Sequence, residues 1–190
     1  MNKIILASGS PRRKQILEWA EVSFEVIVAN TDESYPKNLS AEEVAMHIAG
    51  NKSLAVQKKL LTNDDVYTII AADTIVVLEN KIIGKPADRE DAIKILSALS
   101  GKTHEVITGV CLLSSSKKNV FTEKTKVIFH ELTLAEIEYY IDKYKPYDKA
   151  GAYAIQEWIG VVGVKSIEGD FYNVMGLPVS RVVKELKVMN

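Results

Sequence analysis

Stretches of consecutive apolar residues alternate along the chain with stretches that begin at helix-capping residues. The apolar stretches predict strands at residues 4–7, 24–29, 66–72, 75–78, 81–83, 105–113, 120–129 and 159–164. The capped stretches predict helices at residues 11–20, 40–61, 88–99 and 133–144, and a terminal helix from residue 178 onward. Strands and helices that alternate in this way predict an α/β fold.

Short local signals predict where several of these elements begin and end. Two helices open on a capping box, at residues 40–43 and 133–136, in which two side chains satisfy free N–H groups of the helix start. Residues 63–65, Asn-Asp-Asp, are expected to end the second helix. Residues 79–80, Glu-Asn, are expected to form the turn of a hairpin.

Composition adds limits on size and partners. A chain of 190 residues, 47% hydrophobic and 26% charged, is typical of a folded protein, and we expect one domain over residues 1–190. The formal net charge of −1 does not draw the chain to nucleic acid or to an anionic membrane. No apolar run is long enough to span a bilayer, and no secretory signal follows Met1, so we expect a cytosolic protein. The single cysteine, Cys111, is expected to be a buried structural thiol.

The turn after the first strand combines small residues with positive charge. Ser10 is suited to the N-cap of the first helix and Pro11 to its first position, where a missing N–H costs nothing. Ser8, the glycine after it and the free N–H groups of the helix start would form a pocket for an anion, to which Arg12 and Arg13 add charge. We therefore predict a phosphate-binding corner. The alternative is an ordinary strand–helix junction whose arginines face solvent.

Carboxylates follow two of the predicted strands. Asp73 directly follows one apolar strand, and Glu33, with Asp32 beside it, lies just past another. Ligands of α/β sheets bind beyond the carboxyl ends of strands. Two hard oxygen ligands from separate strand ends suit a Mg²⁺–phosphate site, and Asp73 could also accept a proton from water. The alternatives are that Asp73 caps a turn with Thr74 and that Glu33 is a solvated loop residue.

Two lysines and a glutamine complete the candidate ligand-binding residues. Lys52 is expected to interrupt the second helix after a Gly-Asn pair, and Lys85 lies in a tight Gly-Lys-Pro turn. A lysine on a stiff turn is a well-placed point charge for a phosphate oxygen. Gln156 ends a segment of small residues, and its amide offers the donor and acceptor that suit the edge of a nucleobase. The alternatives are solvated lysines and a packed turn with a surface amide.

Two common active-site motifs are missing from the sequence. It has no G-x-S-x-G turn of a serine hydrolase and no G-x-x-x-x-G-K-[ST] phosphate loop. The three histidines are dispersed and do not have the spacing of metal ligands. A nucleotide or phosphate site in this chain must therefore be built in another way.

The motifs S-G-S-P-R-R, D-E, A-A-D-T, G-K-P, T-G-V and K-A-G-A-Y-x-I-Q occur in this order between Leu6 and Leu177. Together they resemble the Maf family, described as septum-formation-inhibitor-like nucleoside triphosphate pyrophosphatases. The resemblance implies an elongated fold of the inosine-triphosphatase-like type, in which a mixed sheet flanked by helices forms two lobes around a cleft. It also implies a homodimer and the cleavage of a nucleoside triphosphate to the monophosphate and pyrophosphate with a divalent metal, Mg²⁺ or Mn²⁺.

The resemblance also implies roles for particular residues. Asp73 corresponds to the family's proton acceptor and, with Glu33, to its metal ligands. The motifs match the family's phosphate-binding residues at Ser8, Arg13, Lys52 and Lys85. They match the pattern of the dTTP/UTP branch at Arg12, Thr74 and Gln156. The chain departs from the family pattern at Ala154 and at Glu157-Trp158, where glycine is commoner.

These observations lead to one main hypothesis. Asp73 activates a water molecule that attacks the α-phosphorus of dTTP or UTP, while cationic side chains neutralise the charge that develops on the phosphates. One alternative is a non-catalytic nucleotide-binding regulator of cell division that uses the same pocket as a sensor. A second alternative is a sugar-nucleotide-forming nucleotidyltransferase, although the loops of that class contain more glycine than Ser8-Gly9-Ser10.

Overall fold

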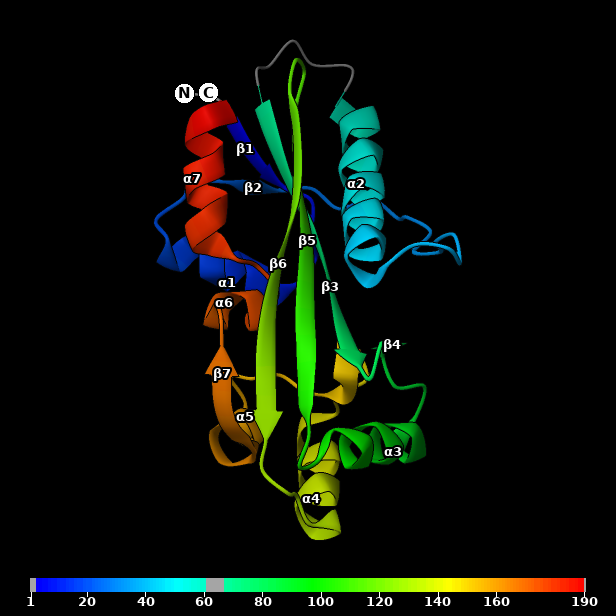
Figure 1. Cartoon of the computed structure of the whole chain (residues 1–190). Helices are drawn as coiled ribbons and strands as arrows, with labels where there is room; N and C mark the ends of the chain where they lie inside the picture. The colour runs from blue at the N-terminus through cyan, green and yellow to red at the C-terminus, as the bar shows by residue number, and fades with distance from the viewer. Residues whose placement is uncertain (1–2, 61–66, 190) are drawn as a thin grey trace. The chain divides into compact units, whose positions relative to one another are not determined.

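The computed structural model describes residues 3–60 and 67–189, so the predicted end of the second helix at residues 63–65 lies outside the described residues. The strands are β1 Lys3–Leu6, β2 Glu25–Val26, β3 Tyr67–Leu78, β4 Lys81–Ile83, β5 Thr103–Ser114, β6 Lys118–Phe129 and β7 Val164–Glu168 (Figure 1). The α-helices are α1 Pro11–Trp19, α2 Ala41–Leu60, α3 Arg89–Leu99, α4 Leu134–Tyr144, α5 Trp158–Gly163, α6 Phe171–Met175 and α7 Val179–Met189, and a 3₁₀-helix, η1, covers Ala150–Ala152.

The described strands form one mixed sheet. Their order is β2-β1-β3-β5-β6-β7, with β4 paired to β3. β1 is parallel to β2 and β3, whereas β4 is antiparallel to β3 and β7 to β6. The predicted α/β class, a mixed sheet flanked by helices, is confirmed. None of the described helices combines the length and the apolar character that a membrane span requires.

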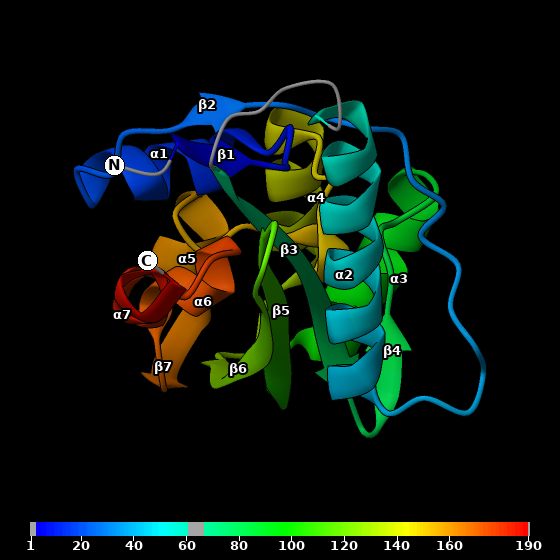
Figure 2. The ribbon, with the colours of Figure 1, turned by 90° about the horizontal axis from the view of Figure 1, so that it is seen from above.

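The chain divides into two compact units. The first contains Met1–Thr74, Thr108–Glu123 and Gly176–Asn190, and the second contains Ile75–Ile107 and Lys124–Met175. In the first unit, α2 covers one face of the strands and α7 the other (Figures 1 and 2). One buried cluster between α2 and the strands contains Ile5, Ala49, Val56, Ile69 and Cys111, among others. Burial raises the pKa of the Cys111 thiol, as expected for a structural cysteine.

In the second unit, α3 packs against α4 (Figure 1). Arg89 Nε on α3 donates to Asp142 Oδ1 on α4 at 2.7 Å. His104 is buried beside the rings of Phe129 and Tyr153, and its Nε2 lies 2.8 Å from the Tyr153 hydroxyl oxygen. Desolvation lowers the pKa of His104 to about 4, so the imidazole is neutral in the folded protein at pH 7.

Several local predictions are confirmed. Both predicted capping boxes form: Glu43 N donates to Ser40 Oγ at 3.2 Å, and the equivalent pair closes the start of α4. The predicted hairpin turn also forms, and Glu79 and Asn80 have φ values of 49° and 64°. Two successive positive φ values are typical of the tight turns whose twist matches that of paired strands.

Three predictions about β3, α2 and β2 are wrong. β3 does not end before Asp73 but runs on to Leu78, so the strands predicted at residues 66–72 and 75–78 are one strand. α2 is continuous through Lys52, because most of its residues around this point pack against the sheet and hold the helix together. β2 contains only Glu25–Val26 of the predicted 24–29, since only these two residues pair with β1.

The strand predicted at residues 159–164 is also wrong, because residues 158–163 form α5. In a strand, Ile159, Val161 and Gly163 would share one face. In the structure, Ile159 and Gly163 are buried whereas Val161 is 79% exposed. A spacing of four between buried positions is that of a helix, and the β-branched residues of this segment concealed it.

Candidate active site

The candidate site lies where β3 passes the end of its parallel neighbour. β1 pairs with β3 as far as Leu6 and Ile70, and Ala7 N then donates to Ile70 O at 2.8 Å. β3 continues beyond this point through Asp73 and Thr74. Asp73 is therefore not at the end of its own strand, but it lies beyond the carboxyl end of β1. This is the edge of a parallel pair at which α/β proteins bind ligands.

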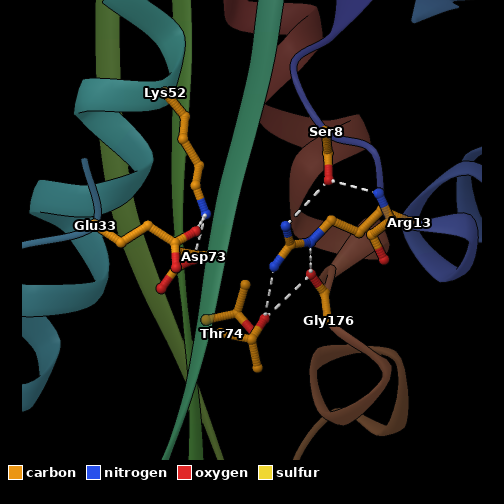
Figure 3. A network of polar contacts seen from close by, with 9 residues as sticks. Ser8, Arg13, Glu33, Lys52, Asp73, Thr74 and Gly176 are labelled. Carbon is orange, nitrogen blue, oxygen red and sulfur yellow. Dashed lines mark hydrogen bonds and ion pairs between the residues drawn. The ribbon is translucent and has the colours of Figure 1, made fainter. Parts of the chain in front are cut away.

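Alternation along β3 sends Asp73 and Thr74 to opposite faces of the sheet. Tyr67, Ile69 and Ala71 belong to the core cluster that packs against α2, and Asp73 continues this face. Thr74 therefore faces the opposite side, where the residues that follow β1 begin α1. The two adjacent residues take part in two different polar networks (Figure 3).

The first network places one cation between two carboxylates. Lys52 Nζ lies 2.6 Å from Asp73 Oδ1 and 2.8 Å from Glu33 Oε1 (Figure 3). The side chains of Asp73 and Lys52 are 14% and 17% exposed, and that of Glu33 is 48% exposed. Lys52 reaches this position because it lies on the stripe of α2 that faces the sheet, three residues after Ala49 and four before Val56. A carboxylate pair that converges on one ammonium group is also placed to share another cation.

The second network holds the Arg13 guanidinium. Its Nε donates to Gly176 O at 2.8 Å, Nη1 to Ser8 Oγ at 3.2 Å and Nη2 to Thr74 Oγ1 at 3.1 Å (Figure 3). Burial lowers the pKa of Arg13, an effect that nearby Asp73 opposes and Arg12 reinforces. An arginine nevertheless remains protonated in proteins. These three partners are neutral oxygens, so the positive charge of Arg13 is available to an anionic ligand.

Ser8 is held so that it can donate a hydrogen bond. Its Oγ accepts from Arg13 Nη1 and from Ser10 N, both at 3.2 Å. A hydroxyl has two lone pairs and one proton, so these contacts leave Ser8 to act on a ligand as a donor. Ser10 occupies the N-cap of α1, but its side chain makes no capping hydrogen bond, and Pro11 is at the first helical position as predicted. A donor hydroxyl near a helix start suits a phosphate oxygen.

One pocket is lined by residues of both networks. Its volume is about 340 Å³, and its lining includes Ser8, Gly9, Glu33 and Lys52. A wider hollow of about 740 Å³ shares the residues 29–31 with it and extends along α2. Of the corner predicted to bind phosphate, Ser8 and Gly9 thus line a recess that also contains an ammonium group and a carboxylate.

The other predicted residues have separate surroundings. Arg12 is half-buried in the first turn of α1. Lys85 and Gln156 are exposed and belong to the second unit, where Gly151 N donates to Gly84 O at 3.1 Å and so joins their two segments. Lys85 lies in an irregular segment between β4 and α3, and Gln156 precedes α5. The first unit therefore gathers Ser8, Arg13, Glu33, Lys52, Asp73 and Thr74.

The comparisons agree with the motifs. A family model described as Maf-like protein matches residues 3–189. The chain belongs to the Maf family. Proteins named dTTP/UTP pyrophosphatase from Parabacteroides distasonis and Phocaeicola vulgatus are 49% and 50% identical to it, over 97% of this chain and 95% of theirs. Another of that name, from Christiangramia forsetii, is 47% identical over 99% of this chain and 94% of its own. A crystal structure of a nucleoside-triphosphatase / dITP/XTP pyrophosphatase from Mycobacterium abscessus matches 67% of this chain and 72% of that one at 15% identity, with a TM-score of only 0.38.

Two residues near the site, Thr108 and Gly176, were not assigned from the sequence. Thr108, in T-G-V, lies with its Oγ1 2.9 Å from Thr74 Oγ1. Gly109 faces α2 instead, where a Cβ would collide with the backbone of Ala45. Gly176 has φ 115°, and its carbonyl accepts from Arg13 Nε. T-G-V was visible as a motif, whereas nothing in the local sequence marks the carbonyl of Gly176.

The carboxylates of Asp73 and Glu33 fit a divalent metal that the substrate phosphates also bind. The described residues contain no group of three or more His, Cys, Asp and Glu side chains suited to hold a metal ion. Asp73 and Glu33 supply two hard oxygen ligands that already converge on one cationic group. Mg²⁺ keeps several waters and is commonly held by one or two carboxylates together with substrate phosphates. The donor set therefore fits a metal that is bound jointly by protein and nucleotide.

Proposed function

We propose that this protein is a nucleoside triphosphate pyrophosphatase that hydrolyses dTTP and UTP to the monophosphate and pyrophosphate. The observation that carries the proposal is the position of Lys52, which contacts both Asp73 and Glu33 and lines a recess together with Glu33 and Ser8. This arrangement combines groups that bind a polyanion with a carboxylate, Asp73, able to take a proton from water. The names of relatives that are about half identical over nearly the whole chain support the same reaction.

In this proposal, the phosphate-binding residues hold the triphosphate. Ser8 donates a hydrogen bond to a phosphate oxygen, and Arg13 offers a positive charge whose hydrogen-bond partners are all neutral. Lys52 and Lys85 neutralise further negative charge. In phosphoryl-type transfer, positioning and charge stabilisation supply most of the rate enhancement.

Asp73 is proposed as the general base. It accepts a proton from the water that attacks the α-phosphorus, and the bond from that phosphorus to the bridging oxygen breaks, so that pyrophosphate leaves. The described contacts of Asp73 use Oδ1 only, which leaves Oδ2 to accept the proton. General-base catalysis of this kind contributes about 10²–10⁴-fold.

Glu33 and Asp73 would hold the divalent metal, Mg²⁺ or Mn²⁺, together with the substrate phosphates. When bound, such an ion supplies Lewis-acid stabilisation of charge on the phosphoryl oxygens. Lys52 contacts the same two carboxylates, so its ammonium group holds them together in the absence of other cations. Once the metal is bound by the two carboxylates, Lys52 would pair with a phosphate oxygen instead.

Base selection is proposed for Arg12 and Gln156, on the match to the dTTP/UTP branch. Gln156 is exposed, and its amide can both donate to and accept from a pyrimidine edge. Thr74 belongs to the same matched set, but its hydroxyl accepts from Arg13, so its effect is proposed to act through that residue. We further propose that residues 1–190 act as one domain in a cytoplasmic homodimer, with the nucleotide and a metal as partners and without nucleic acid or membrane.

The test is a pyrophosphate assay with purified protein and Mg²⁺. Wild-type protein is expected to release equal amounts of pyrophosphate and UMP from UTP. Asp73→Asn keeps the side-chain shape but removes the base, so turnover should fall at least about 100-fold. Asp88→Asn is a matched control, because either residue can cap α3, and it should keep wild-type turnover.

Two results would contradict this assignment. A folded Asp73→Asn protein that still releases pyrophosphate at near the wild-type rate would remove Asp73 from the reaction. A wild-type protein that binds UTP tightly but releases no pyrophosphate with either metal would favour the non-catalytic regulator instead. Circular dichroism of each variant shows whether its fold is intact.

A further inference from the structure

The hydroxyl of Thr74 has three neighbours among the described residues. Its Oγ1 accepts from Arg13 Nη2 at 3.1 Å, lies 2.9 Å from Thr108 Oγ1, and is 3.4 Å from Gly176 O. If Thr108 donates, Thr74 accepts twice and donates once, to the carbonyl of Gly176. These contacts use both lone pairs and the proton of the hydroxyl. Thr74 then has no hydrogen-bonding capacity left for a nucleobase.

Thr108 anchors this arrangement. It lies on β5, the strand next to β3 in the sheet, and none of its surface is exposed. A buried hydroxyl is fixed by its packing, whereas Thr74 is only partly buried. The contact between the two hydroxyls therefore orients Thr74 from a rigid strand.

Arg13 depends on the oxygen atoms around it for its orientation. Each of its three nitrogens donates to a different partner, from Gly176, Ser8 and Thr74. Among these described contacts, three of the five N–H groups of a guanidinium are used. One N–H on each terminal nitrogen remains for a ligand, and its direction depends on the oxygens that hold the others.

We propose that Thr108 is a positioning residue that orients Thr74, and through it the Arg13 guanidinium, for the phosphates of the substrate. Thr74 then influences catalysis through Arg13 and not by contact with the base. The inference rests on the proposed function for the identity of the ligand. The T-G-V motif thereby gains a role for its first residue that differs from that of its glycine.

Kinetics of threonine variants test the proposal. Thr108→Val removes the hydroxyl at almost constant volume, and we expect kcat/KM to fall about five- to tenfold, mostly through KM, as for the loss of one hydrogen bond. Thr108→Ser keeps the hydroxyl and should restore most of the loss. Thr68→Val is the matched control, because Thr68 is a buried threonine of β3 whose Oγ1 has no hydrogen-bond partner among the described residues. It should keep the wild-type kcat/KM.

The substrate ranking separates an action on the phosphates from an action on the base. Thr74→Val and Thr108→Val should lower kcat/KM for dTTP, UTP and GTP by a common factor, so that the ranking of the three stays as in wild type. In an Arg13→Lys background, Thr108→Val should add little further loss, since the residues act as one unit. A changed ranking, or a full additional loss in that background, would overturn the proposal.

A readout that needs no turnover keeps this test separate from the proposed function. The Nε–H proton of Arg13 can be followed by NMR in ¹⁵N-arginine-labelled protein. Its exchange with solvent should be slow in wild type, Thr108→Ser and Thr68→Val, and at least several-fold faster in Thr108→Val. Equal exchange in Thr108→Val and Thr68→Val would refute the positioning role even in an active enzyme. A wild-type protein without pyrophosphatase activity but with the expected exchange pattern would refute only the function.

Discussion

At the scale of single residues, the contacts within the protein determine which donors and charges each side chain can still offer to a ligand. Ser8 accepts twice and so faces the pocket as a donor. Lys52 joins two carboxylates that would otherwise repel each other. Arg13 keeps its charge available because its partners are neutral. Each side chain thus has a defined role toward an anion before any ligand binds.

Base selectivity is a prediction at this scale. We expect Gln156→Ala to narrow the preference for dTTP and UTP over GTP by about tenfold, because one amide that pairs with the base is lost. Release of pyrophosphate from the preferred substrate should continue. Substrate competition assays that follow each monophosphate measure the ranking.

Gln57→Ala, a change of the same type on α2, controls for general effects of the substitution. An unchanged ranking in Gln156→Ala would remove this residue from base selection. A changed ranking in Gln57→Ala would show that the ranking responds to unrelated changes.

At the scale of elements, the strand β3 organises the site. Its residues alternate between the face toward α2 and the opposite face, so that Asp73 and Thr74 serve different networks. β5 repeats this alternation beside it. Thr108 supports Thr74 on one face, and Gly109 on the other lets the backbone of α2 approach closely. The helix that carries Lys52 is thereby held against the sheet.

Gly109→Ala is therefore expected to destabilise the protein. The added methyl group would overlap the backbone of Ala45 and push α2 from the sheet, at a cost of roughly 1–3 kcal/mol or more. Thermal unfolding should show a Tm several degrees lower. Activity should fall as well, because Lys52 moves with the helix.

Gly84→Ala provides the comparison for stability. A Cβ at Gly84 would meet nothing within 4 Å, and the residue is not among those with positive φ. Its Tm should stay close to that of wild type. If Gly109→Ala unfolded at the same temperature as Gly84→Ala, the close approach of α2 would be unimportant for stability.

At the scale of the whole molecule, stability depends on pH through buried His104. Its pKa is lowered to about 4 in the folded protein by desolvation, from 6.5 in the unfolded chain. Between these values the unfolded chain binds a proton that the folded protein does not bind. The free energy of unfolding therefore falls as pH drops from about 6.5 to about 4.

We expect this group to account for about 3 kcal/mol over that interval. Urea unfolding at a series of pH values measures the slope, and His104→Asn, which cannot titrate, should flatten it. Exposed carboxylates whose pKa is lowered in the folded protein, such as Glu43 and Asp142, lose their contribution to stability mainly below this pH interval. An unchanged slope in folded His104→Asn would mean that other groups cause the loss of stability in acid.

Much of the architecture could be predicted from short segments. The capping boxes, the Glu79-Asn80 turn and the proline at the start of α1 were recognised because each depends on atoms within a few residues. The ordered motifs indicated the Maf family, and the comparison with the family model confirms it. The end of β3 and the nature of α5 were missed, because sheet pairing and packing by distant segments decide them.

The sequence by itself determined which chemical groups are present, where most helices begin, and to which family the chain belongs. Only the tertiary structure decided that Lys52 lies between Asp73 and Glu33, and that Thr74 contacts both Thr108 and Arg13. The physical reason is the separation along the chain of the residues that make the stabilising contacts. Caps and turns are stabilised by neighbours in the chain, whereas these networks join residues far apart in sequence whose separation is set by strand register, alternation and the depth of helix packing.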